Sequence, residues 1–287
     1  MTQVLDHGYL NVVESWGSDE RIVEAARMST NKGFLGWGPQ HAVDCSSLCP
    51  CNTGPHPCNC EPKPGDEKLL RYLYENKHAT PFEFAGLVIE VQAPIFVFRE
   101  WHRHRVQSYN EMSARYTPLP DLNYVPTVER LMLKGGSNKQ ASGTGAELTL
   151  YEAELFREKL ADIYRLQETI YQEALCLGVP KELARVHLPV GRYSRMRASA
   201  NLRNWLAFLT LRCAPTAQWE IRQYANALAV ELRKLFPRTM ENHRAHNELR
   251  DWLVAEGHSG RRTAQSSAVV ERGTRYGGEG VNWGSVS

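Results

Sequence analysis

The fourteen residues from Arg103 to Tyr116 concentrate side chains that could bind a small anion. They read Arg-His-Arg-Val-Gln-Ser-Tyr-Asn-Glu-Met-Ser-Ala-Arg-Tyr. A guanidinium is planar and offers paired N–H donors that fit phosphate or carboxylate oxygens. An ordinary solvated surface would favour pairs of Lys and Glu. The segment therefore predicts a polyanion-binding active site. Its arginines are Arg103, Arg105 and Arg115.

Three polar residues in this segment alternate with apolar or small ones. In an extended or turn conformation, Glu111, Ser113 and Arg115 would face one side, where Arg115 and Ser113 could hold a phosphate. No base adjacent to Ser113 is evident, so we assign it to binding. His104 stands between two arginines, which predicts a neutral imidazole that serves in packing, hydrogen bonding or ligand contact.

Other candidate residues lie elsewhere in the chain. His78 precedes a Thr-Pro pair in a predicted loop, where polar residues more often bind than pack. Arg212 ends the apolar run 205–211, so it should have an anionic partner or lie at an interface. Arg203, close to Asn201, lies at the start of the helix that this run predicts, and the same expectation applies to it.

The composition fits one large catalytic domain, which we expect over residues 1–257. The chain has 287 residues, of which 42% are hydrophobic and 23% charged, and its net charge is only +2. The arginine cluster is therefore a local feature, and bulk charge indicates no nucleic-acid partner. No export signal and no run of roughly 18 apolar residues is present, so a cytoplasmic protein without membrane contact is expected. Residues 258–287 are polar and Gly/Ser-rich, which predicts a flexible tail.

Five of the seven cysteines crowd into an aperiodic segment at about 35–65, which predicts an insertion. With no export signal, free thiols or a metal are expected rather than disulfides. No Cys-x-x-Cys pair occurs, so we assign no metal ligand, although a zinc- or iron-sulfur-stabilised module stays an alternative. The clustered residues are Cys45, Cys49, Cys51, Cys58 and Cys60.

Periodicity predicts the elements that must position these side chains. Strands are expected at 3–14, 87–93 and 192–200, because apolar residues run or alternate there. Helices are expected from apolar residues at helical spacing, with Ser18 as an N-cap, Pro94 at a helix start and Gly178 as a stop. The first expected helix begins near residue 19. The others span 66–76, 95–105, 147–177, 180–186, 202–211 and 216–235.

The chain resembles the flavin-dependent thymidylate synthases. The arrangement Arg103-His104-Arg105, seven residues and then Ser113 is similar to the signature of that family, and further segments match in order and spacing across residues 1–34 and 66–240. These segments are Glu24–Ser29, His78–Glu83, Ala93–Val97, Ser108–Tyr116, Ala184–Pro189 and Ala217–Ile221.

The resemblance implies an α/β (α+β) fold in which helices flank a central sheet, and a homotetramer with shared active sites. It implies FAD as cofactor, methylenetetrahydrofolate as carbon donor, NADPH as reductant and a uridine nucleotide as substrate, methylated reductively at C5. Matched positions imply the following roles. Flavin contacts are Ser29, His78, Thr80, Arg103, His104, Arg105, Glu111, Asn201, Arg203 and Leu211. Nucleotide contacts are Glu100, Glu111, Ser113, Arg115, Arg185 and Arg212, and the catalytic candidates are Arg212, Arg185 and His78.

The residues suggest how the poorly nucleophilic C5 of uracil would be activated. A cysteine thiolate could add at C6, but neither Cys176 nor Cys213 lies in the motif. Arginines near the pyrimidine carbonyls would instead stabilise the developing negative charge, while reduced flavin supplies hydride.

The chain departs from the family pattern at the insertion, at the tail, and at Ala207 and Thr216, where the family carries Asn and His. These departures suggest a specialised branch, such as the methylases of nucleoside-antibiotic pathways that accept UMP as well as dUMP. A synthase strict for dUMP and an RNA-binding protein that uses its arginines on phosphates are the alternatives.

Overall fold

A computed structural model describes residues 1–38, 65–133 and 148–255. Residues Met1–Arg244 form one compact unit, and Ala245–Ser287 form a second. The predicted single catalytic domain over residues 1–257 stays a prediction. The cysteine cluster and the predicted tail lie outside the described residues, as does most of the predicted insertion.

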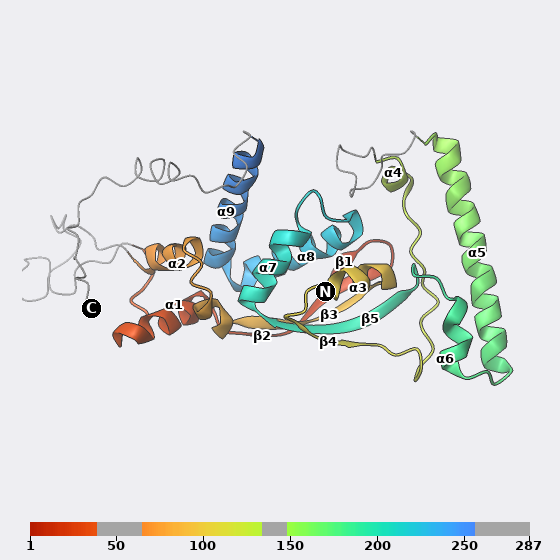
Figure 1. Cartoon of the computed structure of the whole chain (residues 1–287), viewed down its shortest axis with the longest axis horizontal. Coiled ribbons are helices and arrows are strands. Elements are labelled where there is room, and N and C mark those ends of the chain that lie inside the picture. The colour runs from red at the N-terminus through yellow and green to blue at the C-terminus, as the bar shows by residue number, and fades with distance from the viewer. Residues whose placement is uncertain (39–64, 134–147, 256–287) are drawn as a thin grey trace, which may run out of the picture. The chain divides into compact units, whose positions relative to one another are not determined.

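The sheet has five antiparallel strands in the order β1-β2-β3-β5-β4 (Figure 1). The single strand expected over residues 3–14 is wrong, because the chain turns back between β1 and β2. Leu5 adopts φ +60° at this turn. A non-glycine residue rarely adopts a positive φ, so the sequence did not predict the turn. The strands are β1 (Thr2–Val4), β2 (Gly8–Trp16), β3 (Gly86–Pro94), β4 (Ser108–Glu111) and β5 (Tyr193–Asn201).

The predicted helices are present, but the one expected over 95–105 ends at Trp101, so Arg103–Arg105 lie in the turn that follows it. The helices at 128–131 and 237–255 were not predicted. The longest begins at its capping box, in which Thr149 and Glu152 bond each other's backbone N–H groups. The helices are α1 (Asp19–Arg27), α2 (Asp66–Glu75), α3 (Ile95–Trp101), α4 (Val128–Leu131), α5 (Leu150–Cys176), α6 (Lys181–Ala184), α7 (Leu202–Arg212), α8 (Trp219–Leu235) and α9 (Pro237–Ala255). Short 3₁₀ turns are η1 (Met28–Thr30), η4 (Thr80–Phe84) and η5 (Arg185–His187).

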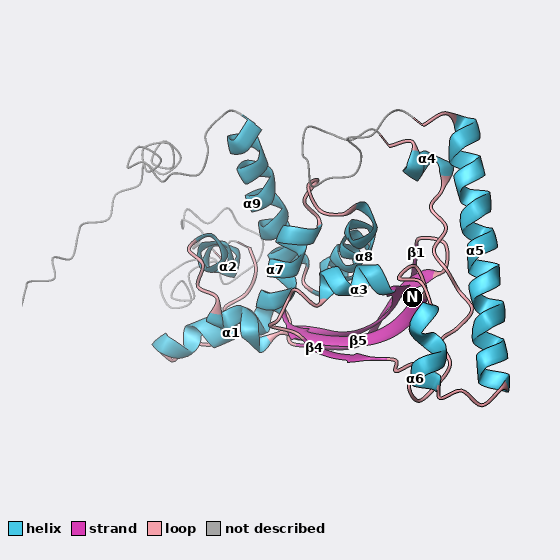
Figure 2. Ribbon diagram, turned by 45° about the vertical axis from the view of Figure 1, so that its right-hand side comes forward, coloured by secondary structure: helices cyan, strands magenta, loops and turns pink. Residues whose placement is uncertain are grey.

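The two faces of the sheet differ in chemistry. Helices α3, α7 and α8 lie on one face, where the alternate residues Leu87, Ile89 and Val91 of β3 are buried (Figure 2). On the opposite face, the Glu90 carboxylate accepts hydrogen bonds from Tyr9 at 2.8 Å and from Arg197 at 3.3 Å. Alternation along β5 follows the same division, so the strand predicted at 192–200 is confirmed.

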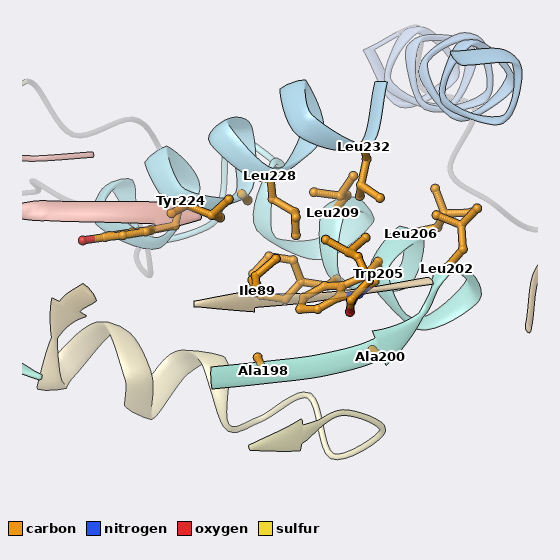
Figure 3. Packing of buried hydrophobic residues seen from close by; sticks show 14 of the residues in the cluster. Ile89, Ala198, Ala200, Leu202, Trp205, Leu206, Leu209, Tyr224, Leu228 and Leu232 are labelled. Atoms are coloured by element: carbon orange, nitrogen blue, oxygen red, sulfur yellow. The ribbon is translucent and has the colours of Figure 1, made fainter. Parts of the chain in front are cut away.

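Aromatic packing fixes α3 and α7 against each other. The ring of Trp101 stacks on that of Phe208, with centroids 4.7 Å apart, and both side chains are buried. Trp205 donates from its indole nitrogen to the Leu87 carbonyl at 3.2 Å, which ties α7 to β3. Figure 3 shows Trp205 of α7 beside Ile89 of β3 among the buried hydrophobic residues. Such close packing leaves side chains little freedom to shift. The C-terminal ends of α3 and α7 are therefore held in a fixed relation.

A buried arginine connects the start of β5 to two neighbouring segments. Arg192 is 1% exposed, forms an ion pair with Glu168 of α5 at 2.6 Å, and donates to Asp121 at 3.1 Å. Its second terminal nitrogen donates to the Leu119 carbonyl at 3.2 Å. A buried guanidinium requires such partners, because leaving a charge unpaired away from water costs several kcal/mol. Arg192 therefore joins β5, the 119–123 segment and α5.

Among the described residues, no helix combines the length and apolar character needed to cross a bilayer.

Candidate functional site

The C-terminal ends of α3 and α7 meet at the Arg212 guanidinium, which makes three hydrogen bonds to two residues. Arg212 donates from Nε to His104 Nε2 at 2.8 Å, from Nη1 to Glu100 Oε2 at 2.7 Å, and from Nη2 to the Glu100 carbonyl at 2.8 Å. We call these three residues the Arg212 cluster. An anionic partner for Arg212 was predicted, and Glu100 confirms it.

His104 is neutral, as predicted, but for a different reason. Its side chain is buried against the Phe208 ring, with centroids 4.8 Å apart. Burial lowers its pKa to about 4, and the charge of Arg212 adds to the effect while Glu100 opposes it. The sequence argument gave this role to the neighbouring Arg103 and Arg105. Their side chains are exposed, so water screens their charges, and the deciding arginine comes from a distant helix.

The segment after α3 is held by polar contacts that the sequence analysis did not identify. The Tyr109 hydroxyl is within hydrogen-bonding distance of the carbonyls of Trp101 and His104, at 3.1 and 2.7 Å. The Asn204 amide of α7 donates to the Val106 carbonyl at 2.9 Å. Nothing in the sequence identified this role of Asn204, because Val106 lies 98 residues away. The Arg103 and Arg105 side chains extend into solvent from this anchored segment and make no polar contact with a described residue.

A second group surrounds the turn after β4, and we call it the Arg115 cluster. The backbone N–H of Arg115 donates to Ser113 Oγ at 3.3 Å, and its Nε donates to Glu182 of α6 at 3.2 Å. Lys181 donates to the Tyr116 carbonyl at 2.9 Å. Arg185 follows α6 directly, so the turn and Arg185 belong to neighbouring segments. The Arg115–Glu182 pair is about half exposed, so a phosphate could replace the carboxylate at little cost.

A third group of predicted residues lies where α1, η4 and the start of α7 meet. Arg203 donates to Glu83 of η4 at 3.0 Å, and Asn201 caps α7 by accepting from Asn204 N at 3.0 Å. Ser29 and His78 are exposed at the ends of the segments that pack there, as is Thr80 at the start of η4. Of these residues, Ser29, His78, Thr80, Asn201 and Arg203 belong to the predicted flavin set.

The predicted site residues thus fall into three groups. Leu211 is 62% exposed beside Arg212, and Glu111 ends β4 next to the Arg115 cluster. No hydrogen bond or ion pair between described residues joins the Arg212 cluster to the Arg115 cluster. Two positions depart from the family pattern. Of these, Ala207 is exposed on α7 and Thr216 is exposed before α8.

The cysteines of the described region do not offer a reactive thiolate near these groups. Burial raises the pKa of the Cys213 thiol to about 11, so it stays protonated at neutral pH. Cys176 is an exposed free thiol at the end of α5. Within residues 1–38, 65–133 and 148–248 no cluster of three metal-ligating side chains occurs. The cysteine-rich segment, where a metal was the alternative, lies outside those ranges.

Comparison with known proteins decides the family. Residues 11–238 match the family described as "Thymidylate synthase complementing protein". The chain belongs to this family. It is 36% identical over 242 residues to a flavin-dependent thymidylate synthase of Thermosipho melanesiensis, covering 84% of this chain and 92% of the relative. A flavin-dependent thymidylate synthase of Thermus thermophilus is 36% identical over 234 residues, covering 82% of this chain and 74% of that protein.

Solved structures of the family agree with the fold. The crystal structure of the UMP/dUMP methylase PolB from Streptomyces cacaoi bound with 5-Br UMP matches with a TM-score of 0.66 and 29% identity. The match covers 85% of this chain and 96% of that one. The same enzyme bound with 5-Br dUMP matches with a TM-score of 0.67 and 30% identity. The predicted fold, a central sheet flanked by helices, is confirmed, as is the predicted resemblance to this branch of the family.

Proposed function

We propose that the protein methylates a uridylate at C5 by reduction, with FAD as cofactor, methylenetetrahydrofolate as carbon donor and NADPH as reductant. The observation that carries the proposal is the Arg212 guanidinium, which neighbouring groups hold in place with N–H donors left over for a ligand. C5 becomes nucleophilic when the ring gains enolate character, which places negative charge on the pyrimidine carbonyl oxygens. A fixed cation there stabilises that charge.

The nucleotide contacts divide between the two arginine clusters. Arg115 and Ser113 suit the phosphate, because a guanidinium and a hydroxyl can both donate to its oxygens. Arg212 suits the pyrimidine, since its partly buried donors act in a medium of low polarity. Arg185 follows α6 beside the Arg115 cluster and completes the catalytic set with Arg212 and His78. The proposed nucleotide contacts are Glu111, Ser113, Arg115, Arg185 and Arg212, while Glu100, which the resemblance also implies, is bonded to Arg212.

The residues present fit a flavin with its pyrophosphate. Arg103 and Arg105 are exposed on an anchored segment and make no polar contact with a described residue, so both can pair with phosphate oxygens. When bound, FAD supplies the hydride that reduces the transferred carbon. This chain's residues would bind and orient it. The proposed flavin contacts are Ser29, His78, Thr80, Arg103, Arg105, Glu111, Asn201, Arg203 and Leu211, while His104, which the resemblance also implies, is buried and bonded to Arg212.

A visible absorption spectrum of the purified protein tests the flavin. The proposal expects a yellow protein, or one that turns yellow and stays so after incubation with FAD and removal of the excess. A colourless protein that cannot take up FAD, but binds RNA with an affinity that falls steeply with salt, would support the RNA-binding alternative.

The sugar of the substrate distinguishes two candidate activities. The related PolB has been crystallised with both 5-Br UMP and 5-Br dUMP, which supports acceptance of either sugar here. One hydroxyl is enough to exclude a ligand from a tight pocket. Turnover of UMP and dUMP should be measured side by side with both co-substrates. Strict dependence on dUMP would favour an ordinary thymidylate synthase and remove the antibiotic-pathway branch.

Replacing Arg115 by alanine is expected to weaken nucleotide binding more than flavin binding. Loss of a charge-assisted hydrogen bond to phosphate should lower dUMP affinity by about 10- to 100-fold. Titration calorimetry with dUMP and fluorescence titration with FAD would measure the two affinities. Glu182→Gln is the matched control, because it removes the competing ion pair and should leave dUMP affinity unchanged or raise it. Equal losses for both ligands would contradict the assigned role.

We further propose a homotetramer in which neighbouring copies share active sites. Support comes from α5, where Phe156, Ile163 and Ile170 recur every seven residues and are each 44–51% exposed. An exposed apolar stripe at this spacing is typical of a helix that packs against another helix. Between the described residues of one copy, no hydrogen bond or ion pair joins the Arg212 and Arg115 clusters, which fits a site completed by a second copy.

A glutamate in the stripe tests this interface. Ile163→Glu combined with Ile170→Glu is expected to produce smaller oligomers and a loss of turnover, because burying two carboxylates between helices is unfavourable. Size-exclusion chromatography with light scattering would measure the oligomeric state. The control is Arg165→Glu, which changes charge on the same helix at a residue with a 79% exposed side chain. An unchanged oligomer in the double variant would exclude this face as the interface.

A further inference from the structure

Two residues assigned to ligands by resemblance have other partners in the structure. His104 is in the predicted flavin set and Glu100 in the predicted nucleotide set. Their acceptor atoms are instead directed at Arg212, at 2.8 Å from His104 Nε2 and 2.7 Å from Glu100 Oε2. His104 is also 8% exposed, so little of its ring can reach a ligand.

The tautomer of His104 follows from its partner. A guanidinium has only donors, so the Nε2 atom of His104 must accept, and the ring proton lies on Nδ1. A protonated imidazole would carry N–H groups at both nitrogens and would repel Arg212. The lowered pKa of His104, caused first by burial, keeps the acceptor form at neutral pH.

The hydrogen bonds also determine which donors of Arg212 remain. A guanidinium has five N–H bonds, and three of them point at His104 and Glu100. One N–H on each terminal nitrogen is left. With Nε and one side of each terminal nitrogen engaged, the plane of the group cannot rotate. The side chain remains 16% exposed, so the remaining donors are accessible to a ligand.

We propose that Glu100 and His104 are positioning residues that fix Arg212 so that its two remaining N–H bonds point at the uridylate. This inference rests on the proposed function, because it takes the uridylate as the ligand. The two residues act through Arg212. A misplaced Arg212 would still carry its charge, but its donors would no longer meet the pyrimidine oxygens as charge develops.

A double-mutant cycle tests the inference. His104→Phe keeps the packing against Phe208 and removes the acceptor, and it is expected to lower kcat by about 10- to 100-fold with a smaller change in KM. In an Arg212→Ala background, the same change should alter kcat by less than about twofold, because no guanidinium is left to position. His104→Gln, which retains an acceptor, should recover part of the loss.

Variants of Glu100 provide a second test of the proposal, in which no buried side chain is replaced. Its carboxylate is 40% exposed, so Glu100→Gln and Glu100→Ala should both fold, which thermal unfolding would verify. In the Arg212→Ala background, Glu100→Ala is also expected to change kcat by less than about twofold. An equal loss from His104→Phe or Glu100→Ala in both backgrounds would overturn the proposal.

The inference and the proposed function fail in different ways. If wild-type protein turns over neither UMP nor dUMP, the proposed function is wrong, and the same cycle is then run on dUMP affinity by calorimetry. Non-additive affinities would still support the positioning of Arg212. Additive affinities, or no dUMP binding by the wild-type protein, would overturn it.

Discussion

Arg212→Ala is expected to lower the turnover of a uridylate by about 100- to 1,000-fold, the usual cost of removing one donor that stabilises developing charge. Flavin content should stay close to that of the wild-type protein, because no flavin role is assigned to Arg212. Steady-state kinetics with dUMP and UMP, together with the flavin absorbance of each preparation, would measure both.

Two matched variants give this result its meaning. Arg212→Lys keeps the positive charge but has no planar fork, so it should recover only part of the activity. Arg233→Ala removes an exposed arginine from the last turn of α8, outside the proposed site, and should leave turnover unchanged. Near-normal kcat in Arg212→Ala would show that the guanidinium does not act on the reacting ring.

Arg192→Met is expected to destabilise the fold by about 3 kcal/mol, since removing one partner of a buried ion pair leaves the other charge uncompensated. Methionine fills similar space, so the change measures the lost charge more than a cavity. Glu168 would lose its partner at 2.6 Å, and the Leu119 carbonyl would lose a donor. The free energy of unfolding, measured in urea at neutral pH, would report the effect.

Arg197→Met is the control for that measurement. Arg197 lies on the same strand, but its side chain is 57% exposed and its ion pair with Glu90 is at the surface. Its replacement should change stability by no more than about 0.5 kcal/mol. Similar losses in both variants would mean that Arg192 contributes no more than a surface arginine.

The fold was largely predictable because its elements carry strong local patterns. Leu87–Ala93 has apolar residues at alternate positions, and α5 and α7 have apolar residues at helical spacing, so β3 and both helices were found from sequence. The β1–β2 turn was missed, because a positive φ at Leu5 has no sequence signal. Local patterns determine the elements, whereas this turn depends on the pairing of two strands.

The partners within the site were less predictable. An anionic partner or an interface was expected for Arg212 from the apolar run before it, but nothing in the sequence identified Glu100, which lies 112 residues away. The neutral state of His104 was predicted for the wrong reason, because burial first and then the distant Arg212 lower its pKa. Arg192 was not distinguished from surface arginines, since its burial depends on Glu168 of a separate helix. Tertiary contacts decide each of these cases.

The central claim is C5-methylation of a uridylate, and release of tritium from 5-tritiated dUMP and UMP tests it most directly. Purified protein would be incubated with FAD, NADPH and methylenetetrahydrofolate, and the nucleotide product identified by mass spectrometry. The account predicts tritium release with formation of a 5-methyl nucleotide, both dependent on NADPH and strongly reduced in Arg212→Ala. A flavin-loaded protein that binds the nucleotide but releases no more tritium than Arg212→Ala, and forms no methylated product, would contradict it.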